Sequence, residues 1–301
     1  MLEMKNATFC IVVITRNRGE RIRPALRSIK DIRYPPDRYE VIVVDNGSTD
    51  NTAGVVAQEL ADALFSWKVV TENVKGICRA RNTGWRAAGG NWVIYLDDDA
   101  IVPEQWLIAY AEALDAYPEA VVFGGPASLD ENLVRPWWWC RKFDWTMSCQ
   151  DYGEELKPYP DGGHPYGLNM MIRRDVLRQT RGFDLRLDDE TSSFADETEL
   201  FIRLMKTGAR LIYVPGTRVV HCVEQDRLAW KPYMDRRELV GRSHAYLDHN
   251  HNTDFRHPLL KHFRIALEDF CSFLTPAVFV QEMREWRGYR KYIKEVAGIL
   301  P

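Results

Sequence analysis

The sequence of 301 residues has no apolar run that approaches the length of a membrane-spanning helix. A span needs about 20 apolar residues, whereas the run at 270–280 is short and contains Pro276. The apolar run at 9–14 is too short for a signal peptide and continues directly into polar residues, so it predicts a buried strand. We therefore expect a cytoplasmic protein that contacts a membrane only peripherally, at its inner face.

Paired cysteines and an excess of charge of one sign are also absent. The six cysteines are far apart, form no C-x-x-C pair and in several cases lie within apolar runs. This pattern indicates buried thiols in a reducing compartment rather than disulfides or a zinc site. Lys and Arg number 40 against 43 Asp and Glu, so the formal net charge is −3. Without a basic field, we expect no nucleic-acid partner.

The pattern of the first 125 residues predicts an α/β fold. Short runs rich in Val and Ile alternate with longer amphipathic stretches, which is typical of βαβ units with a largely parallel sheet. Strands are expected at 9–14, 40–44, 67–70, 92–96 and 120–123.

A long loop follows at 125–163, and it contains four prolines and the run Trp137-Trp138-Trp139. Loops of this length in compact domains are usually lids or binding segments. The tryptophans could either stack on a sugar or pack the loop against the body of the protein. After the loop, the pattern predicts strands at 168–172, 210–214 and 218–222, a helix at about 194–207 and further helices from 226.

Polar residues follow the expected strands at the end where ligands bind in open α/β sheets. Asp97, Asp98 and Asp99 come directly after one strand, and three adjacent carboxylates repel one another unless a cation or protons offset them. Asp97 and Asp99 lie on the same side of an extended backbone and could hold one Mg²⁺ or Mn²⁺. The alternative is a solvated acidic turn that caps the next helix. Asp45 ends another strand, and it could bind a base or ribose or only begin a turn.

Four segments resemble, in order, the serial motifs of the family 2 inverting glycosyltransferases, which have the GT-A fold. They are Ile14 to Asn17, Val43 to Asp50, Arg79 to Gly84 and Leu96 to Asp99. Each motif alone is weak, but four with matching order and spacing over about 100 residues are specific. The resemblance continues to about residue 225. It implies a Rossmann-like, mostly parallel central sheet flanked by helices.

The resemblance also implies which residues bind the donor. Asp45 would contact the base or ribose. Asp99 would bind Mn²⁺ or Mg²⁺ together with Asp97 and with His221, unless His221 is only structural. The metal would offset the negative charge that builds on the departing diphosphate. The implied substrate-binding residues are Thr15, Arg16, Asn17, Asp45, Arg79, Arg81, Asn82, Asp97, Asp98, Gly167 and Asn169.

The expected catalytic base lies in the pair Asp196-Glu197, within the helix predicted at about 194–207. Acidic residues in a first helical turn are favoured by the helix dipole in any case. Family 2 enzymes, however, place their base here, usually in a Glu-Asp pair. The order is reversed in this sequence, which leaves both residues as candidates, and by position we favour Glu197. We expect the crowded acidic cluster to raise the pKa of the base.

The resemblance predicts a catalytic domain at 1–225 and a helical region at 226–301. Within the first, residues to about 125 would bind the nucleotide and 126–225 would face the acceptor. The expected reaction moves one sugar from a nucleotide-diphosphate sugar, with a UDP-sugar favoured, to a hydroxyl of a glycan or lipid-linked glycan. It would serve the synthesis of a bacterial surface polysaccharide or glycolipid. The basic and aromatic C-terminal helices would contact a membrane surface or form a solvated face.

Two other functions are considered. A nucleotidyltransferase that makes sugar nucleotides would need a Gly-rich basic loop after the first strand, where residues 15–20 read TRNRGE. A catalytically inactive sugar-nucleotide-binding module would not need carboxylates at 97, 99, 196 and 197. Both therefore fit the sequence less well than a glycosyltransferase.

Overall fold

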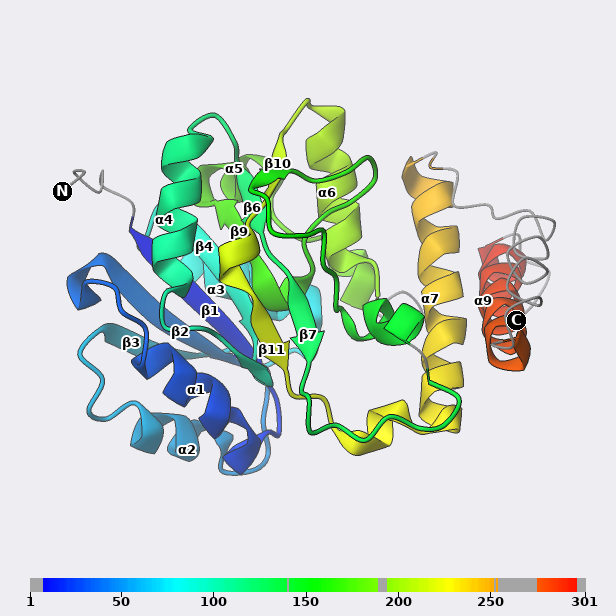
Figure 1. Ribbon diagram of the computed structural model, residues 1–301, viewed down its shortest axis with the longest axis horizontal. Helices are drawn as coiled ribbons and strands as arrows, with labels where there is room; N and C mark the ends of the chain where they lie inside the picture. Colours follow the sequence, from blue (N-terminus) through cyan, green and yellow to red (C-terminus); the bar gives the residue numbers. More distant parts are fainter. Residues whose placement is uncertain (1–7, 140, 189–193, 252, 254–274, 297–301) are drawn as a thin grey trace.

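The computed structural model describes residues 8–139, 141–188, 194–251, 253 and 275–296. Its centre is a sheet with the strand order β3-β2-β1-β4-β9-β6-β10-β8 (Figure 1). The first four strands of this order are parallel: β1 (Phe9–Thr15), β2 (Tyr39–Asp45), β3 (Ser66–Thr71) and β4 (Trp92–Asp97). The predicted α/β fold is confirmed, and each of these strands lies within one residue of its expected bounds.

The second half of the chain adds strands of mixed direction. β9 (Met170–Arg173) lies antiparallel between β4 and β6 (Val122–Gly124), and β10 (Leu211–Tyr213) runs parallel to β6. β8 (Lys157–Pro158) pairs antiparallel with β10 at the edge. The strand expected at 168–172 begins two residues later because Gly167–Asn169 forms a short 3-10 helix.

Helices cover both faces of this sheet. Alternate residues of β1 point to opposite faces, so that Ile11 and Val13 belong to one apolar cluster and Cys10 and Val12 to the other. The first cluster includes residues of α1 (Arg23–Lys30), α2 (Thr52–Glu59) and α4 (Trp106–Ala116). The second includes residues of α3 (Ile77–Ala87), α5 (Arg174–Thr180) and α6 (Asp196–Lys206). The helix expected at about 194–207 is confirmed as α6.

A second, smaller sheet lies beside the carboxyl end of β4. It has the order β5-β11-β7 and consists of β5 (Ala100–Ile101), β11 (Val219–His221) and β7 (Ala127–Leu129). The pairing of β11 with β5 sets His221 opposite Ala100, and the backbone N–H of Cys222 donates to the carbonyl of Asp99 at 2.8 Å. This short sheet therefore brings the end of β11 next to the three consecutive aspartates.

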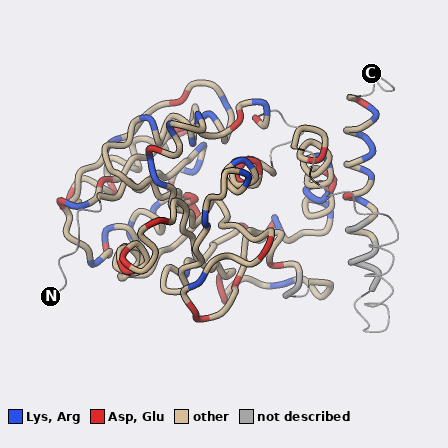
Figure 2. The backbone as a smooth tube through the Cα atoms, turned by 90° about the horizontal axis from the view of Figure 1, so that it is seen from above, with Lys and Arg blue, Asp and Glu red and all other residues tan. Residues whose placement is uncertain are grey.

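Two long helices follow the sheet, α7 (Trp230–His251) and α9 (Thr275–Val296). They lie side by side at one end of the molecule (Figure 2). A Cβ atom at Gly241 would collide with the carbonyl oxygen of Glu285, and one at Gly288 with that of Glu238, so the two backbones are in direct contact. Buried Arg237 of α7 forms an ion pair with Glu285 of α9. Among the helices of the described residues, none is both long and apolar enough to cross a membrane.

The long loop packs against α7 through its aromatic residues. Trp138 and Trp139 contact Tyr233 of α7, with ring centroids 5.2 and 5.3 Å away, whereas Trp137 is 96% exposed. The loop contains the 3-10 helix η3 (Arg141–Met147). Two of the three consecutive tryptophans thus pack the loop against the body.

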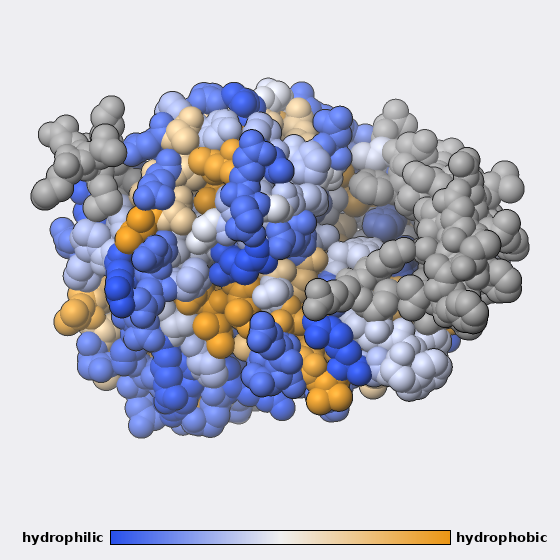
Figure 3. All heavy atoms as spheres, viewed as in Figure 1, coloured by the Kyte–Doolittle hydropathy of each residue, from blue (hydrophilic) through white to orange (hydrophobic). Residues whose placement is uncertain are grey.

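On the face seen in Figure 3, apolar residues gather toward the middle and hydrophilic residues surround them.

Candidate functional site

A cavity of about 980 Å³ lies at the carboxyl ends of β1 and β4. One wall comes from the segments that follow β1, β2 and β4, and the other from η3, α6 and α7. The structure therefore brings together segments that are far apart in the sequence, from Ile14 to His244. Nine of the residues selected from the sequence line this cavity: Thr15, Arg16, Arg81, Asp97, Asp98, Asp99, Gly167, Asp196 and Glu197.

Asp97, Asp99 and His221 form a group that could hold a metal ion, with one ligand atom from each lying within 4.8 Å of the others. His221 Nδ1 lies 2.8 Å from the carbonyl oxygen of Met147, and because a carbonyl only accepts, this nitrogen carries the proton. Nε2 lies 3.1 Å from Asp99 Oδ1 but makes no hydrogen bond with any described residue. Nε2 and this carboxylate oxygen therefore face each other with lone pairs, which repel. A cation between the two atoms or a second proton on His221 would relieve this repulsion. The donor set fits Mn²⁺ or Mg²⁺.

Burial and neighbouring charges act differently on the three aspartates. Burial, and then the charge of Asp99, raise the pKa of Asp97. Burial raises the pKa of Asp98 to about 7, although Arg18 opposes the shift from 3.3 Å away. Burial also acts to raise the pKa of Asp99, but His221, in the form that carries a second proton and donates to this carboxylate, and the nearby Arg227 and Arg18 outweigh burial and lower this pKa. Asp99 is therefore the most readily ionised of the three.

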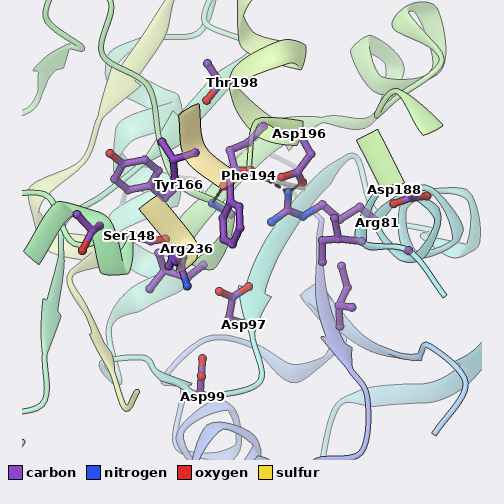
Figure 4. Close-up of a pocket in the computed structure, with 18 of the residues that line it drawn as sticks. Arg81, Asp97, Asp99, Ser148, Tyr166, Asp188, Phe194, Asp196, Thr198 and Arg236 are labelled. Atoms are coloured by element: carbon purple, nitrogen blue, oxygen red, sulfur yellow. Dashed lines mark hydrogen bonds and ion pairs between the residues drawn. The ribbon is translucent and has the colours of Figure 1, made fainter. Parts of the chain in front are cut away.

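Across the cavity, the first turn of α6 carries Asp196 and Glu197. Arg81 of α3 forms ion pairs with both carboxylates and lies 3.2 Å from Glu197 Oε2; Figure 4 shows Arg81 directed toward Asp196. The backbone N–H of Gly167 donates to Glu197 Oε1 at 3.1 Å. A Cβ atom at Gly167 would collide with the Arg81 guanidinium, so glycine is needed for this close approach.

The pKa of Glu197 is lowered, which corrects the increase expected from a crowded acidic cluster. Burial acts to raise it, but the charge of Arg81 and backbone N–H groups, including that of Gly167, outweigh burial. The Glu197 side chain is 15% exposed, whereas that of Asp196 is 4% exposed. Glu197 is therefore an ionised carboxylate that a substrate can reach more easily than Asp196.

Two of the predicted substrate-binding residues, Asn82 and Asn169, make buried hydrogen bonds within the protein. The amide of Asn82 donates to the carbonyl of Phe183 at 2.8 Å and accepts from the N–H of the same residue at 2.9 Å. The amide oxygen of Asn169 accepts from Trp106 and Tyr110, and its nitrogen donates to two backbone carbonyls. Both side chains are buried and hydrogen-bonded within the protein, and their contacts with a substrate stay predictions.

Asn17, Asp45 and Arg79 are not part of the cavity wall among the described residues. Asn17 Oδ1 accepts from the backbone N–H of Thr49, and Asp45 Oδ1 accepts from that of Ser48, so these residues shape the loop after β2. Arg79 Nε lies 3.7 Å from the carboxylate of Asp188. Their contacts with a nucleotide stay predictions.

Asp188 has a role that the sequence does not reveal. Its two carboxylate oxygens accept from the backbone N–H groups of Cys78 and Arg79, at 2.7 and 3.1 Å, and so cap the start of α3. It also lines the cavity. Because more than 100 residues separate it from the helix it caps, no local sequence pattern could identify it.

Three comparisons with known proteins agree with this geometry. Residues 10–181 match the sequence model of a family described as glycosyl transferase family 2. The chain is 28% identical to a glucosyl-dolichyl phosphate glucuronosyltransferase of Haloferax volcanii, over 79% of this chain and 76% of that protein. It is 26% identical to the succinoglycan biosynthesis protein ExoM of Rhizobium meliloti, over 94% and 90%.

The chain is also similar to the solved structure of the mannosyltransferase PcManGT from Pyrobaculum calidifontis in complex with GDP-Man and Mn²⁺. The TM-score is 0.61 at 19% identity, over 97% of this chain and 86% of that chain. At this identity, the likeness shows a shared fold alone.

His164 also lines the cavity and generates a prediction about pH. Its Nδ1 lies 3.0 Å from the carbonyl of Pro165 and its Nε2 lies 3.1 Å from Thr198 Oγ1. Burial lowers its pKa. Its contribution to stability is therefore present above the unfolded pKa of about 6.5 and is lost as the pH falls toward the folded value, since the unfolded chain binds the proton first.

We expect the free energy of unfolding to fall more steeply toward acid in the wild type than in His164→Gln. Urea unfolding between about pH 5 and 8 measures the two slopes. His249→Gln, at an exposed position of α7, is the control and should match the wild type. Equal slopes for wild type and His164→Gln would contradict the prediction.

Proposed function

The chain belongs to glycosyl transferase family 2 and has the GT-A fold of its structural relatives, and from this premise we propose a metal-dependent, inverting transfer of one sugar. The donor is a nucleotide-diphosphate sugar, with a UDP-sugar favoured. The acceptor is a hydroxyl of a glycan or lipid-linked glycan in polysaccharide or glycolipid synthesis. The names of the relatives from Haloferax volcanii and Rhizobium meliloti, one acting on a lipid-linked sugar and one in succinoglycan biosynthesis, support this assignment.

The observation that carries the proposal is the pair of carboxylate groups on opposite sides of one cavity. Asp97, Asp99 and His221 would hold Mn²⁺ or Mg²⁺, which would offset the charge on the leaving diphosphate. Glu197 lies on the other wall and is the base. It removes the proton from the acceptor hydroxyl, whose oxygen bonds to the anomeric carbon as the bond from that carbon to the diphosphate oxygen breaks. Attack opposite the leaving group inverts the configuration.

Arginines near the metal ligands support the placement of the diphosphate. Arg18 lies 3.6 Å from Asp99 Oδ2 and Arg227 lies 3.5 Å from the same atom. Both can therefore reach a phosphate bound beside this carboxylate. We assign the nucleotide to the adjoining segment of Thr15 and Arg16, with Asp45 and Arg79 as further contacts.

The C-terminal helices would complete the acceptor side of the catalytic domain at 1–225. Arg236, Arg237 and Val240 of α7 line the cavity, which supports a role for the region at 226–301 in shaping the acceptor site. The nucleotidyltransferase alternative conflicts with the family assignment. The inactive-module alternative is tested by the experiments below.

We also propose that α9 contacts an anionic membrane surface. Arg290 and Lys291 are exposed, and apolar Ile293 and Val296, which are 39% and 48% exposed, lie among them. Lys and Arg recur along the described part of this helix (Figure 2). The free thiols at Cys10, Cys78, Cys149 and Cys222 are consistent with a reducing compartment, so we place the contact on the cytoplasmic side.

Calorimetric titration with UDP, GDP and dTDP, each with Mn²⁺ and with EDTA, tests the donor class. We expect one nucleotide to bind in a metal-dependent manner. Asp99→Asn should weaken this binding about tenfold or more because it removes a charged ligand atom. Asp62→Asn, which changes an exposed carboxylate (76% exposed) on another part of the surface, is the control. The absence of binding for all three nucleotides would contradict the proposal.

The assignment of the base predicts a separation of binding from chemistry. Glu197→Gln should keep the metal-dependent nucleotide affinity but lower the rate of transfer about 100-fold or more, since the proton acceptor is lost. Release of nucleoside diphosphate in the presence of the acceptor used by the wild type measures the rate. Normal transfer by Glu197→Gln with an inactive Asp196→Asn would instead assign the base to Asp196.

The membrane contact predicts sedimentation with vesicles that contain phosphatidylglycerol but not with pure phosphatidylcholine. Neutralising Arg290, Lys291 and Lys294 with Gln should weaken binding about 100-fold, since each basic residue near an anionic surface contributes about 1 kcal/mol. The matched control neutralises Arg33, Lys157 and Arg210 on the catalytic domain. Equal binding by the two triple variants would refute the contact.

A further inference from the structure

Arg236 differs from the other arginines that line the cavity. Arg18, Arg81 and Arg227 each form ion pairs with carboxylates of the site, and Arg237 pairs with Glu285 of α9. Arg16 is exposed to solvent. Arg236 is half-buried, lines the cavity, and forms no ion pair or hydrogen bond with any residue in the described ranges.

The surroundings of Arg236 stabilise its charge only weakly. Its guanidinium carbon lies 4.6 Å from the centre of the Phe194 ring, which gives a cation–π contact. Burial, and then the charges of Arg227 and Arg237, lower its pKa to about 9, while Asp97 and Glu197 act in the opposite direction. Arg236 is still protonated at neutral pH. A partly buried cation with like charges nearby and no carboxylate partner is unfavourable, and a bound anion would offset this cost.

The position of Arg236 indicates which substrate carries the anion. The site for the diphosphate is at Asp97 and Asp99, where Arg18 and Arg227 already supply positive charge. Arg236 comes from α7, on the wall of the cavity that η3, α6 and α7 form, and in the view of Figure 4 it appears on the same side as Ser148 of the long loop. It is thus on the wall assigned to the acceptor.

We propose that the acceptor carries an anionic group and that Arg236 binds it. This inference rests on the proposed function, because it names the chemistry of the acceptor in the same cavity. The group is a phosphate or a sugar carboxylate, both of which a guanidinium can bind through two parallel hydrogen bonds. Phe194 stacks on the guanidinium, and Glu197 faces the acceptor hydroxyl. Arg236 is therefore a specificity-determining residue that selects acidic over neutral acceptors.

Three probes with the same sugar ring test this inference: glucose 1-phosphate, methyl glucuronide and neutral methyl glucoside. The full chain is first loaded with Mg²⁺ and the nucleoside diphosphate that it binds, so that the diphosphate site is filled. Dissociation constants are then measured by saturation-transfer NMR. We expect at least one anionic probe to bind the wild type more tightly than the glucoside does. Arg236→Gln should weaken that probe about tenfold or more, and Arg236→Lys less.

Binding of the glucoside should not change in Arg236→Gln, and the surface variant Arg33→Gln should behave as the wild type for every probe. A preference for glucose 1-phosphate would identify a phosphate-bearing acceptor, and a preference for the glucuronide an acidic sugar. The inference is overturned if neither anion binds better than the glucoside, or if Arg236→Gln weakens the nucleoside diphosphate instead. Failure of the proposed function is distinct, since the nucleotide would then not bind at all.

Discussion

The structure depends on the accumulation of negative charge around one cavity and on the cations that offset it. Among the described residues, six carboxylates line this cavity: Asp97, Asp98, Asp99, Asp188, Asp196 and Glu197. In a partly desolvated space, such groups repel strongly unless positive charge lies beside them. The chain supplies Arg18 after β1, Arg81 on α3 and Arg227 before α7, each from a different element. The site therefore depends on the assembly of several segments that are distant in the sequence.

Charge balance also divides the cavity into two parts with different chemistry. At the β4 end, Arg18 and Arg227 supply positive charge beside Asp99, while His221 Nε2 faces the same carboxylate without a hydrogen bond, which suits a metal and a diphosphate. At α6, Arg81 and the N–H of Gly167 hold Glu197 ionised, which suits a proton acceptor. A single fold thus presents, on facing walls, residues that could hold a cation and an ionised carboxylate, the arrangement that the proposed displacement of a diphosphate requires.

The sequence allows most of the main sheet and the positions of the acidic residues to be predicted, because these follow from local patterns. Strands buried on both faces read as continuous apolar runs, and the polar residues at their carboxyl ends are recognisable. The strands β5, β7 and β8 have only two or three residues, too few to show the alternation of apolar and polar side chains that identifies a strand. The buried hydrogen bonds of Asn82 and Asn169 could not be predicted, because a motif gives a residue type and not the partners of its side chain.

The cap that Asp188 provides and the cavity contacts of Arg236 could not be predicted for a different reason. Both depend on contacts between residues far apart in the sequence, and no pattern within either segment records them. The direction of the pKa shift of Glu197 depends on the same kind of contact, since Arg81 is 116 residues away. The sequence therefore indicates which charged residues lie near the site, whereas the charges that surround each of them cannot be predicted from it.

The backbone contact between α7 and α9 at Gly241 and Gly288 fixes the distance between these two helices. No side chain lies between the helices at this crossing, so rotamer changes cannot alter their separation there. A surface bound by α9 would therefore lie at a constant distance from the cavity wall that α7 forms. If that surface is the membrane of the proposed function, an anchored acceptor would have to place its hydroxyl at this distance from it to meet Glu197. The spacing of two helices would then influence which acceptors fit, in addition to contacts within the cavity.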